Sequence, residues 1–154
     1  MGGKNRKSKK PSDTKTQLRE HLEFITFFLD RSLESKIVLE ELRKAGVTIE
    51  PHAAHFVPDA PDTVWLQAIG LKGWVMLMKD KNIKHNYIER RMLLSSKVKA
   101  FLFVPGNLKA IEMAEIIIKA LPKIVRFVKR YEAPFLARIE KDSSVKMWLD
   151  SSAS

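Results

Sequence analysis

Short apolar segments alternate along this chain with longer amphipathic ones, as they do where strands are separated by helices. The first apolar run, at residues 24–30, lacks polar alternation and predicts a strand buried on both faces, which is typical of a parallel sheet covered by helices. Three further runs predict strands at 47–50, 74–78 and 100–104. We expect these strands to pair in parallel through right-handed crossovers.

The amphipathic segments between the strands predict helices that each bury one face. The expected helices span residues 32–45, 63–71, 86–94 and 108–130. Ser32 is the candidate N-cap of the first, and Pro122 should kink or restart the last. The apolar spacing places Val64 of the second helix and Ile88 of the third on the buried side.

The C-terminal part has a different pattern. Two apolar segments, 135–140 and 145–149, flank a short polar turn and predict a β-hairpin. The whole order of elements predicts an α/β fold, namely a three-layer α/β/α sandwich with a mainly parallel central sheet plus a C-terminal β-hairpin. Trp65, Trp74 and Trp148 fall within apolar patterns, so we expect them in the core.

Composition narrows the class of protein. The 154 residues suit one domain, and the absence of cysteine excludes disulfides, thiolate zinc sites and cysteine nucleophiles. No apolar run approaches the roughly 18 residues that a membrane span needs, and no apolar signal core follows the first basic residues. We therefore expect a soluble protein of the cytoplasm with no membrane partner.

The charge is strongly basic, with 28 Lys and Arg against 18 Asp and Glu. Residues 1–23 are expected to form a basic tail, disordered through about residue 17 and followed by a short helical turn. Residues 24–150 would form the domain, and 151–154 a second short tail. The body remains basic without the tail, and this field favours polyanions, RNA first among them.

Three acids follow the predicted strands or lead into them. Asp30 ends the first apolar run, Asp80 follows the predicted strand at 74–78, and Asp62 opens the helix that precedes that strand. An acid in a first helical turn also has an ordinary explanation in capping. If the two strands are neighbours, the three carboxylates converge at the carboxyl edge of the sheet. Their repulsion would then be relieved by a divalent cation such as Mg²⁺ or Mn²⁺, which suits phosphodiester hydrolysis.

The segments 29–33 (LDRSL), 58–66 (PDAPDTVWL) and 79–81 (KDK) together resemble PIN-like domains. The similarity covers residues 24–149 and is closest to the compact, VapC-like group found among toxins of bacterial toxin–antitoxin modules. It implies an α/β/α sandwich and a metal-dependent endoribonuclease that cleaves RNA. Asp30, Asp62 and Asp80 would be the catalytic, metal-binding acids. It further implies a cognate antitoxin as partner and suggests a homodimer.

The sequence departs from this family at one position. Where related groups show a second acid after the KDK segment, this chain has Asn82, which can orient a water or a phosphate but carries no charge. Asp59 is a possible additional ligand. Glu40 and Glu41 are further candidates, although solvated charges on a helix face are their simpler interpretation.

Basic residues beside the acids are candidates for contacts with substrate phosphates. Arg31, Lys79 and Lys81 flank the predicted metal site, and His55 either braces its loop or contacts a phosphate. His52 and His55 lack a third ligand at the spacing of a zinc site. A basic stripe on the last predicted helix is either a solvated face or an RNA track: Lys119, Lys123, Arg126 and Arg130.

Two other classes of function remain to be weighed. A non-catalytic RNA-binding or scaffold module with a PIN-like body would bind RNA through its basic tail and show no turnover. A phosphoaspartate protein is disfavoured, because Ser32 stands where a dehalogenase-like phosphatase needs its second acid.

Overall fold

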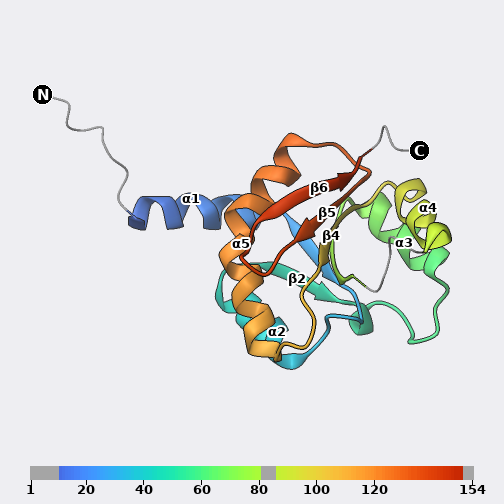
Figure 1. The fold of residues 1–154 in the computed structure, drawn as a ribbon, viewed down its shortest axis with the longest axis horizontal. Coiled ribbons are helices and arrows are strands. Elements are labelled where there is room, and N and C mark those ends of the chain that lie inside the picture. The colour runs from blue at the N-terminus through green and yellow to red at the C-terminus, as the bar shows by residue number, and fades with distance from the viewer. Residues whose placement is uncertain (1–10, 81–85, 151–154) are drawn as a thin grey trace, which may run out of the picture.

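The computed structural model describes residues 11–80 and 86–150, and side chains from Thr16 onward. Its elements in chain order are α1 (Pro11–Glu23), β1 (Thr26–Leu29), α2 (Lys36–Lys44), β2 (Thr48–Pro51), the 3₁₀ turn η2 (His52–Ala54), α3 (Asp62–Lys72), β3 (Val75–Lys79), α4 (Tyr87–Ser95), β4 (Lys99–Phe103), α5 (Ala110–Arg130), β5 (Phe135–Ile139) and β6 (Val145–Leu149) (Figure 1).

The sheet has the strand order β2-β1-β3-β4-β5-β6. The first five strands pair in parallel, and β6 returns antiparallel to β5. This arrangement confirms the predicted sandwich, its mainly parallel sheet and its C-terminal hairpin. It also makes β1 and β3 neighbours, so Asp30 and Asp80 follow adjacent strands.

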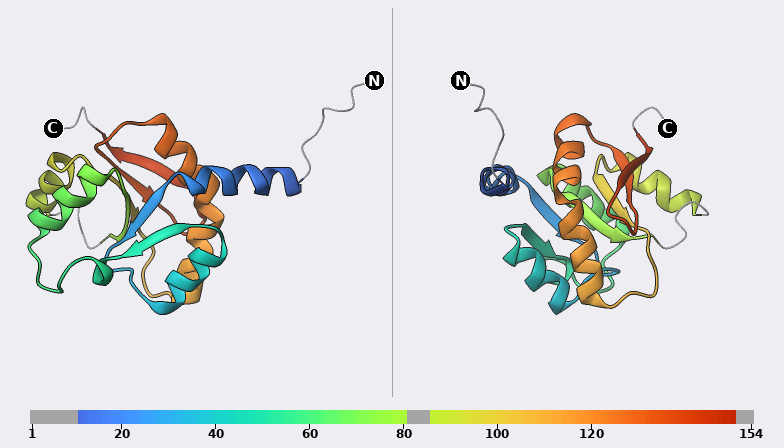
Figure 2. Two further views of the ribbon diagram at one scale, coloured as in Figure 1. Left: turned by 180° about the vertical axis from the view of Figure 1, so that it is seen from behind. Right: turned by 60° about the vertical axis from the view of Figure 1, so that its left-hand side comes forward.

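Helices cover the sheet on both sides and enclose two cores (Figure 2). Successive residues of β1 alternate between them: Phe27 and Leu29 pack in the core under α2 and α5, and Phe28 packs in the core under α3 and α4. The second core includes Trp65, with Trp74 and Trp148 packed against it, as expected. A strand without polar alternation is therefore explained by apolar layers on both faces.

The helices of the second layer lie unusually close together. A Cβ added at Gly70 of α3 would lie 2.1 Å from the carbonyl oxygen of Ser96, at the end of α4. A side chain at position 70 would therefore force the two helices apart. This contact fixes the position of α4, and hence of the side chains that α4 presents at the edge of the sheet.

The predicted N-cap of the first helix is wrong by three residues. Residues 31–33 form a turn, α2 begins at Lys36, and the amide of Val38 donates to the hydroxyl of Ser35 at 3.0 Å. The hydroxyl of Ser32 is already engaged with the ends of β1 and β3, so it cannot serve as the cap.

Three further details of the helix predictions are wrong. Val64 is 55% exposed and Ile88 71% exposed, because α3 buries Trp65 and Ile69 instead and α4 is oriented by its buried Leu93. Pro122 does not restart the helix, because α5 continues through it; the alternative prediction, a kink at Pro122, stays a prediction. Its ring lies on the exposed side of the helix, so it does not disturb the core.

Helix α1 corrects the expectation of disorder as far as it concerns residues 11–17. Pro11 is its first residue, a position that suits proline. The helix projects from the body, and its C-terminal end is anchored by Leu22, which is fully buried in the core beneath α5 (Figures 1 and 2). The rest of the predicted tails, 1–10 and 151–154, lies outside the described residues. The division into tail and domain stays a prediction.

Within the described ranges, no helix combines the length and apolarity needed to cross a lipid bilayer.

Candidate active site

The carboxyl ends of β1 and β3 position the two strand-end acids. The amide of Asp30 donates to the carbonyl of Leu77 at 3.0 Å, and the amide of Asp80 donates to the carbonyl of Phe103 at 2.9 Å. Each acid is therefore held by the hydrogen-bond pattern of the sheet, even though it lies beyond the last strand residue. Both side chains leave from the backbone at the edge where parallel α/β sheets bind ligands.

Asp30 is held by the turn that follows it. Its Oδ2 accepts hydrogen bonds from the amide of Ser32 at 3.0 Å and from the Ser32 hydroxyl at 2.6 Å. The same hydroxyl accepts from the amide of Lys79 at 3.0 Å. Ser32 therefore joins the ends of β1 and β3 and fixes one oxygen of Asp30, whose side chain is almost fully buried.

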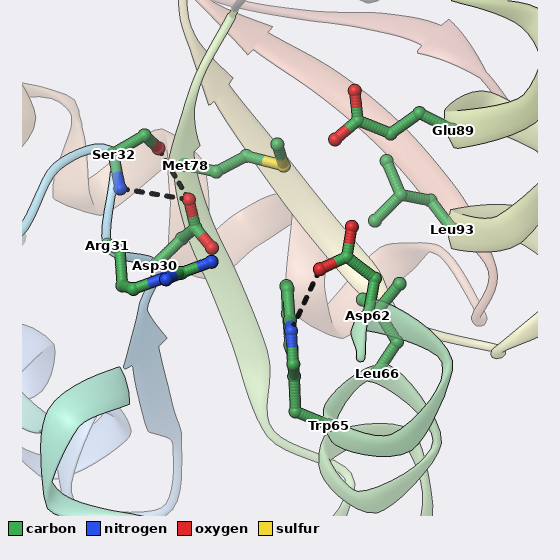
Figure 3. A pocket seen from close by; sticks show the side chains of 9 residues that line it. All are labelled: Asp30, Arg31, Ser32, Asp62, Trp65, Leu66, Met78, Glu89 and Leu93. Atoms are coloured by element: carbon green, nitrogen blue, oxygen red, sulfur yellow. Dashed lines mark hydrogen bonds between the residues drawn. The ribbon is translucent and has the colours of Figure 1, made fainter. Parts of the chain in front are cut away.

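Asp30 faces a cavity of about 250 Å³ at this edge (Figure 3). The residues that line it are Asp30, Arg31, Ser32, Asp62, Trp65, Leu66, Met78, Glu89 and Leu93. Three of them are acids, and they come from three elements. Asp62 and Glu89 point into the gap from α3 and α4, on the side opposite Asp30 (Figure 3).

Asp62 is held in the first turn of α3. Its Oδ1 accepts a hydrogen bond from the indole nitrogen of Trp65 at 3.0 Å. The capping explanation for Asp62 is therefore incomplete, because its carboxylate also lines the cavity. Trp65 lies in the second core and stacks on Phe28, with ring centroids 5.7 Å apart, so the indole is a rigid support for Asp62.

Glu89 is the acid that the sequence analysis missed. Its amide donates to the side-chain oxygen of Asn86, the N-cap of α4, at 3.0 Å. An acid three residues after a capping asparagine is usually explained by the helix terminus alone. The available signal was the amphipathic register of α4, since Glu89 precedes the buried Leu93 by four residues and shares its side of the helix.

Asp80 is placed differently from the other predicted acids. It does not line the cavity, and its Oδ2 accepts from the Arg138 guanidinium on β5 at 3.3 Å. The guanidinium carbon of Arg138 also lies 5.2 Å from the centroid of the Trp148 ring. The structure therefore brings Asp30 and Asp62 to one cavity and gives Asp80 a cationic partner that the sequence did not reveal.

The predicted phosphate-binding residues lie in different environments. Arg31 lines the cavity, and its guanidinium donates to the carbonyl of Pro58. His55 forms a 2.7 Å contact with Glu50, in agreement with its loop-bracing alternative. Lys79 is half-buried at the end of β3. Lys81 and Asn82 fall in the undescribed segment 81–85.

The other candidate acids lie away from the cavity. Asp59 is exposed on the loop before α3 and is not among the lining residues. Glu40 and Glu41 belong to α2, which covers the opposite face of the sheet, and Glu41 pairs with Lys44 at 3.3 Å. None of the three is placed to replace Asp80 at the cavity.

His52 lies behind this edge in an aromatic environment. It is fully buried, and both ring nitrogens lack a hydrogen-bond partner among the described residues. Its ring contacts Phe28, Phe56 and Trp65. Burial lowers the pKa of His52, with a further lowering by the nearby Arg31 charge; the carboxylates of Asp30, Glu34 and Asp62 oppose it. The histidine is therefore a neutral member of this aromatic cluster and does not line the cavity.

The donors at the cavity suit a hard divalent cation. Carboxylate oxygens line it, and among the described residues Oδ1 of Asp30 and Oδ2 of Asp62 accept no hydrogen bond. No group of three or more acidic, histidine or cysteine side chains in the described ranges is close enough to hold a metal ion. Mg²⁺ commonly uses only one or two protein carboxylates, with waters and substrate phosphates. Asp30 and Asp62 would supply two such carboxylates.

The chain is a member of the PIN-like domain family, whose pattern matches residues 25–104 and so includes β1 through β4 and all three predicted acids. It is also similar to a Mycobacterium tuberculosis protein named "Putative ribonuclease VapC45". The two are 28% identical over 124 residues, which cover 78% of this chain and 89% of that protein. No solved structure shows a significant match.

Proposed function

We propose that the protein is a metal-dependent endoribonuclease, the toxin of a toxin–antitoxin pair. The observation that carries the proposal is the shared cavity of Asp30 and Asp62, at the sheet edge where such folds bind their ligands. Membership in the PIN-like family supports it, as does the ribonuclease name of the Mycobacterium tuberculosis relative. Mg²⁺ or Mn²⁺ is the proposed cofactor, and RNA the substrate.

The roles of the residues follow from their positions. Asp30 and Asp62 would hold the cation, each through the oxygen that accepts no hydrogen bond. When bound, the cation would lower the pKa of a water molecule and stabilise charge on the scissile phosphate. Arg31, which lines the cavity, would contact that phosphate, and Glu89, across the cavity, would orient the attacking water.

Asp80 belongs to the proposed site as an acid at its margin. Its pairing with Arg138 holds the carboxylate beside the cavity rather than in it. In this proposal Asp80 adds negative charge to the site when substrate and cation are bound. Lys79 and Lys81 are proposed as outer phosphate contacts, and Asn82 as a further polar ligand.

The decisive experiment compares variants of the cavity acids. Asp30→Asn and Asp62→Asn should each abolish Mn²⁺-dependent cleavage of a labelled single-stranded RNA and leave the circular-dichroism spectrum unchanged. Glu40→Gln is the matched control, because it also removes one carboxylate, but from α2 on the opposite face. Unchanged cleavage by both cavity variants would contradict the proposal.

The same assay separates the alternative function. A non-catalytic RNA-binding module would bind the RNA without added metal and show no turnover at any metal concentration. Turnover that is lost on chelation and restored by Mn²⁺ would exclude that alternative.

The proposed partners follow from the same family membership. We propose a cognate antitoxin protein that inhibits cleavage, a homodimeric state and a cytoplasmic location, where RNA is available. The antitoxin proposal is tested by co-purification. We expect the product of a neighbouring gene to co-purify with this protein, and its removal to release nuclease activity.

A further inference from the structure

The outer side of α5 carries a basic surface far from the candidate active site. We define it by five exposed residues of its C-terminal half: Lys119, Lys123, Arg126, Lys129 and Arg130. No acid interrupts residues 119–130. Four of the five bases recur at intervals of three or four residues, so they form one stripe about 16 Å long along the helix.

These charges are not neutralised by neighbouring acids. In the described part of the chain, none of the five takes part in a salt bridge. The carboxylate of Asp142 senses the positive charge of Lys123, which contributes to lowering the Asp142 pKa after its hydrogen bonds to Ser144. Acids lie near one end of the stripe, where Asp142 acts on Lys123 and Glu115 precedes Lys119 by one helical turn. Neither acid forms a salt bridge with the stripe.

A groove of about 270 Å³ lies beside this surface, between α1 and α5. The residues that line it are Gln17, Leu18, His21, Pro122, Val125, Arg126 and Lys129. Its floor is apolar, and its α5 rim carries two of the five bases. Drug-sized ligands occupy pockets of roughly 300–1,000 Å³, so this groove suits a smaller group.

We propose that this basic surface and groove bind single-stranded RNA. Phosphates of the strand would lie along the stripe, where they would pair with its basic side chains. A base would lie against Leu18, Pro122 and Val125, with its phosphate on Arg126 and Lys129. Single-stranded nucleic acid is typically held by a basic track with aromatic side chains on which bases stack. Here the ring of His21 and the apolar groove floor would take the place of those aromatic side chains.

The surface is spatially separate from the candidate active site. α5 packs in the core on one face of the sheet, whereas the cavity of Asp30 and Asp62 is built on the other face. RNA held on α5 therefore does not occupy the cavity. The inference concerns binding alone and holds whether or not the cavity cleaves RNA.

The test measures binding without cleavage. Fluorescence anisotropy of a labelled oligouridine of about 20 nucleotides is followed in the Asp30→Asn background without divalent metal, at several salt concentrations. In this background, Arg126→Gln with Lys129→Gln should weaken binding about 25-fold at 0.1 M salt. It should also reduce the slope of log K against log salt by about 1.4, since each phosphate contact on a single strand contributes roughly 0.7.

The matched control removes two charges from the opposite layer, with Lys72→Gln and Lys97→Gln in the same background. Lys72 ends α3 and Lys97 follows α4, so this pair lies away from the groove. We expect less than a threefold change. If both pairs of substitutions weaken RNA binding equally, the effect is explained by net charge alone, and the proposal is overturned.

Two further outcomes distinguish the hypotheses. Binding of polyglutamate, but not of oligouridine, to this surface would overturn the proposal in favour of an acidic protein partner. If the wild type fails to cleave RNA but the two double variants differ as expected, the proposed nuclease function fails and the RNA surface stands. If the wild type cleaves RNA normally but the two double variants bind oligouridine equally well, the proposed nuclease function stands and the RNA surface fails.

Discussion

The ends of β1 and β3 carry the same sequence feature and reach different outcomes. Both strands end in an acid held to the neighbouring strand by its amide. Asp30 is bound by its own turn, through Ser32, and turns one oxygen to the cavity. Asp80 is bound by Arg138, from two strands away. A buried strand followed by an acid therefore marks the ligand-binding edge, but the partner of the acid decides what the acid does there.

The largest expected difference between the two strand ends is in catalysis. Asp30→Asn should lower the rate of metal-dependent RNA cleavage 100-fold or more, which corresponds to about 2.7 kcal/mol of transition-state stabilisation. It should change thermal stability little, because the amide oxygen of asparagine can still accept from the Ser32 amide. Single-turnover cleavage and thermal unfolding of the same preparation check both statements. A large loss of stability would mean that Asp30 has a structural role.

At the end of β3, by contrast, we expect substitutions to lower the stability of the fold. Arg138→Met removes one cationic partner of the largely buried Asp80 carboxylate and should lower the free energy of unfolding by about 2 kcal/mol. Denaturant titration measures the change. Asp80→Asn should cost a similar amount, and the double variant should cost less than the sum of the two. Additive costs would show that the 3.3 Å contact contributes nothing.

His52, whose ring contacts Phe28 of β1, should make the stability of the protein depend on pH. Its pKa is lowered from 6.5 in the folded protein, so the unfolded chain binds more protons below that pH. The contribution of His52 to the free energy of unfolding is complete above about pH 6.5. It is lost as the pH falls toward the lowered pKa of His52, with a slope of at most about 1.4 kcal/mol per pH unit. His52→Phe should remove this slope and retain the ring contacts. Denaturant midpoints between pH 7.5 and 5 test it, and a variant that keeps the wild-type slope would contradict this assignment.

The smallest expected effect concerns the link between the two strand ends. Ser32→Ala removes the acceptor of the Lys79 amide and a donor to Asp30, and should cost about 1 kcal/mol of stability. Cleavage should fall as well, because Asp30 loses one of the groups that hold it. Ser35→Ala is an informative comparison, since it removes a helix cap of similar energy. We expect it to lower stability without a matching loss of cleavage.

The fold could be predicted because its signals are local. Most strands are short apolar runs, and the crossover helices α2 and α5 are amphipathic, so most of the order of elements follows from periodicity. Helix α3 is an exception, because it exposes Val64 and Leu71. Ser32 was misassigned for a physical reason. A serine before a helical pattern is normally a cap, and nothing in the sequence shows that its hydroxyl is used by residues 30 and 79 instead.

The candidate site was predicted only in part, because it depends on the placement of whole elements. Glu89 reaches the cavity because α4 packs closely on α3 at Gly70, and that distance is not encoded in the spacing of acids. Arg138 meets Asp80 because β5 lies two strands from β3. The strand order that brings them together is a property of the assembled sheet, so no segment of sequence reveals it alone.

Strand β2 has a consequence for how copies of this protein can associate. It forms one margin of the sheet, has only four residues and ends in Pro51, which has no amide hydrogen. Such a margin is a poor template for another strand, which protects the protein from edge-to-edge aggregation. We therefore expect a dimer of this chain to form through its helices, not by extension of the sheet past β2.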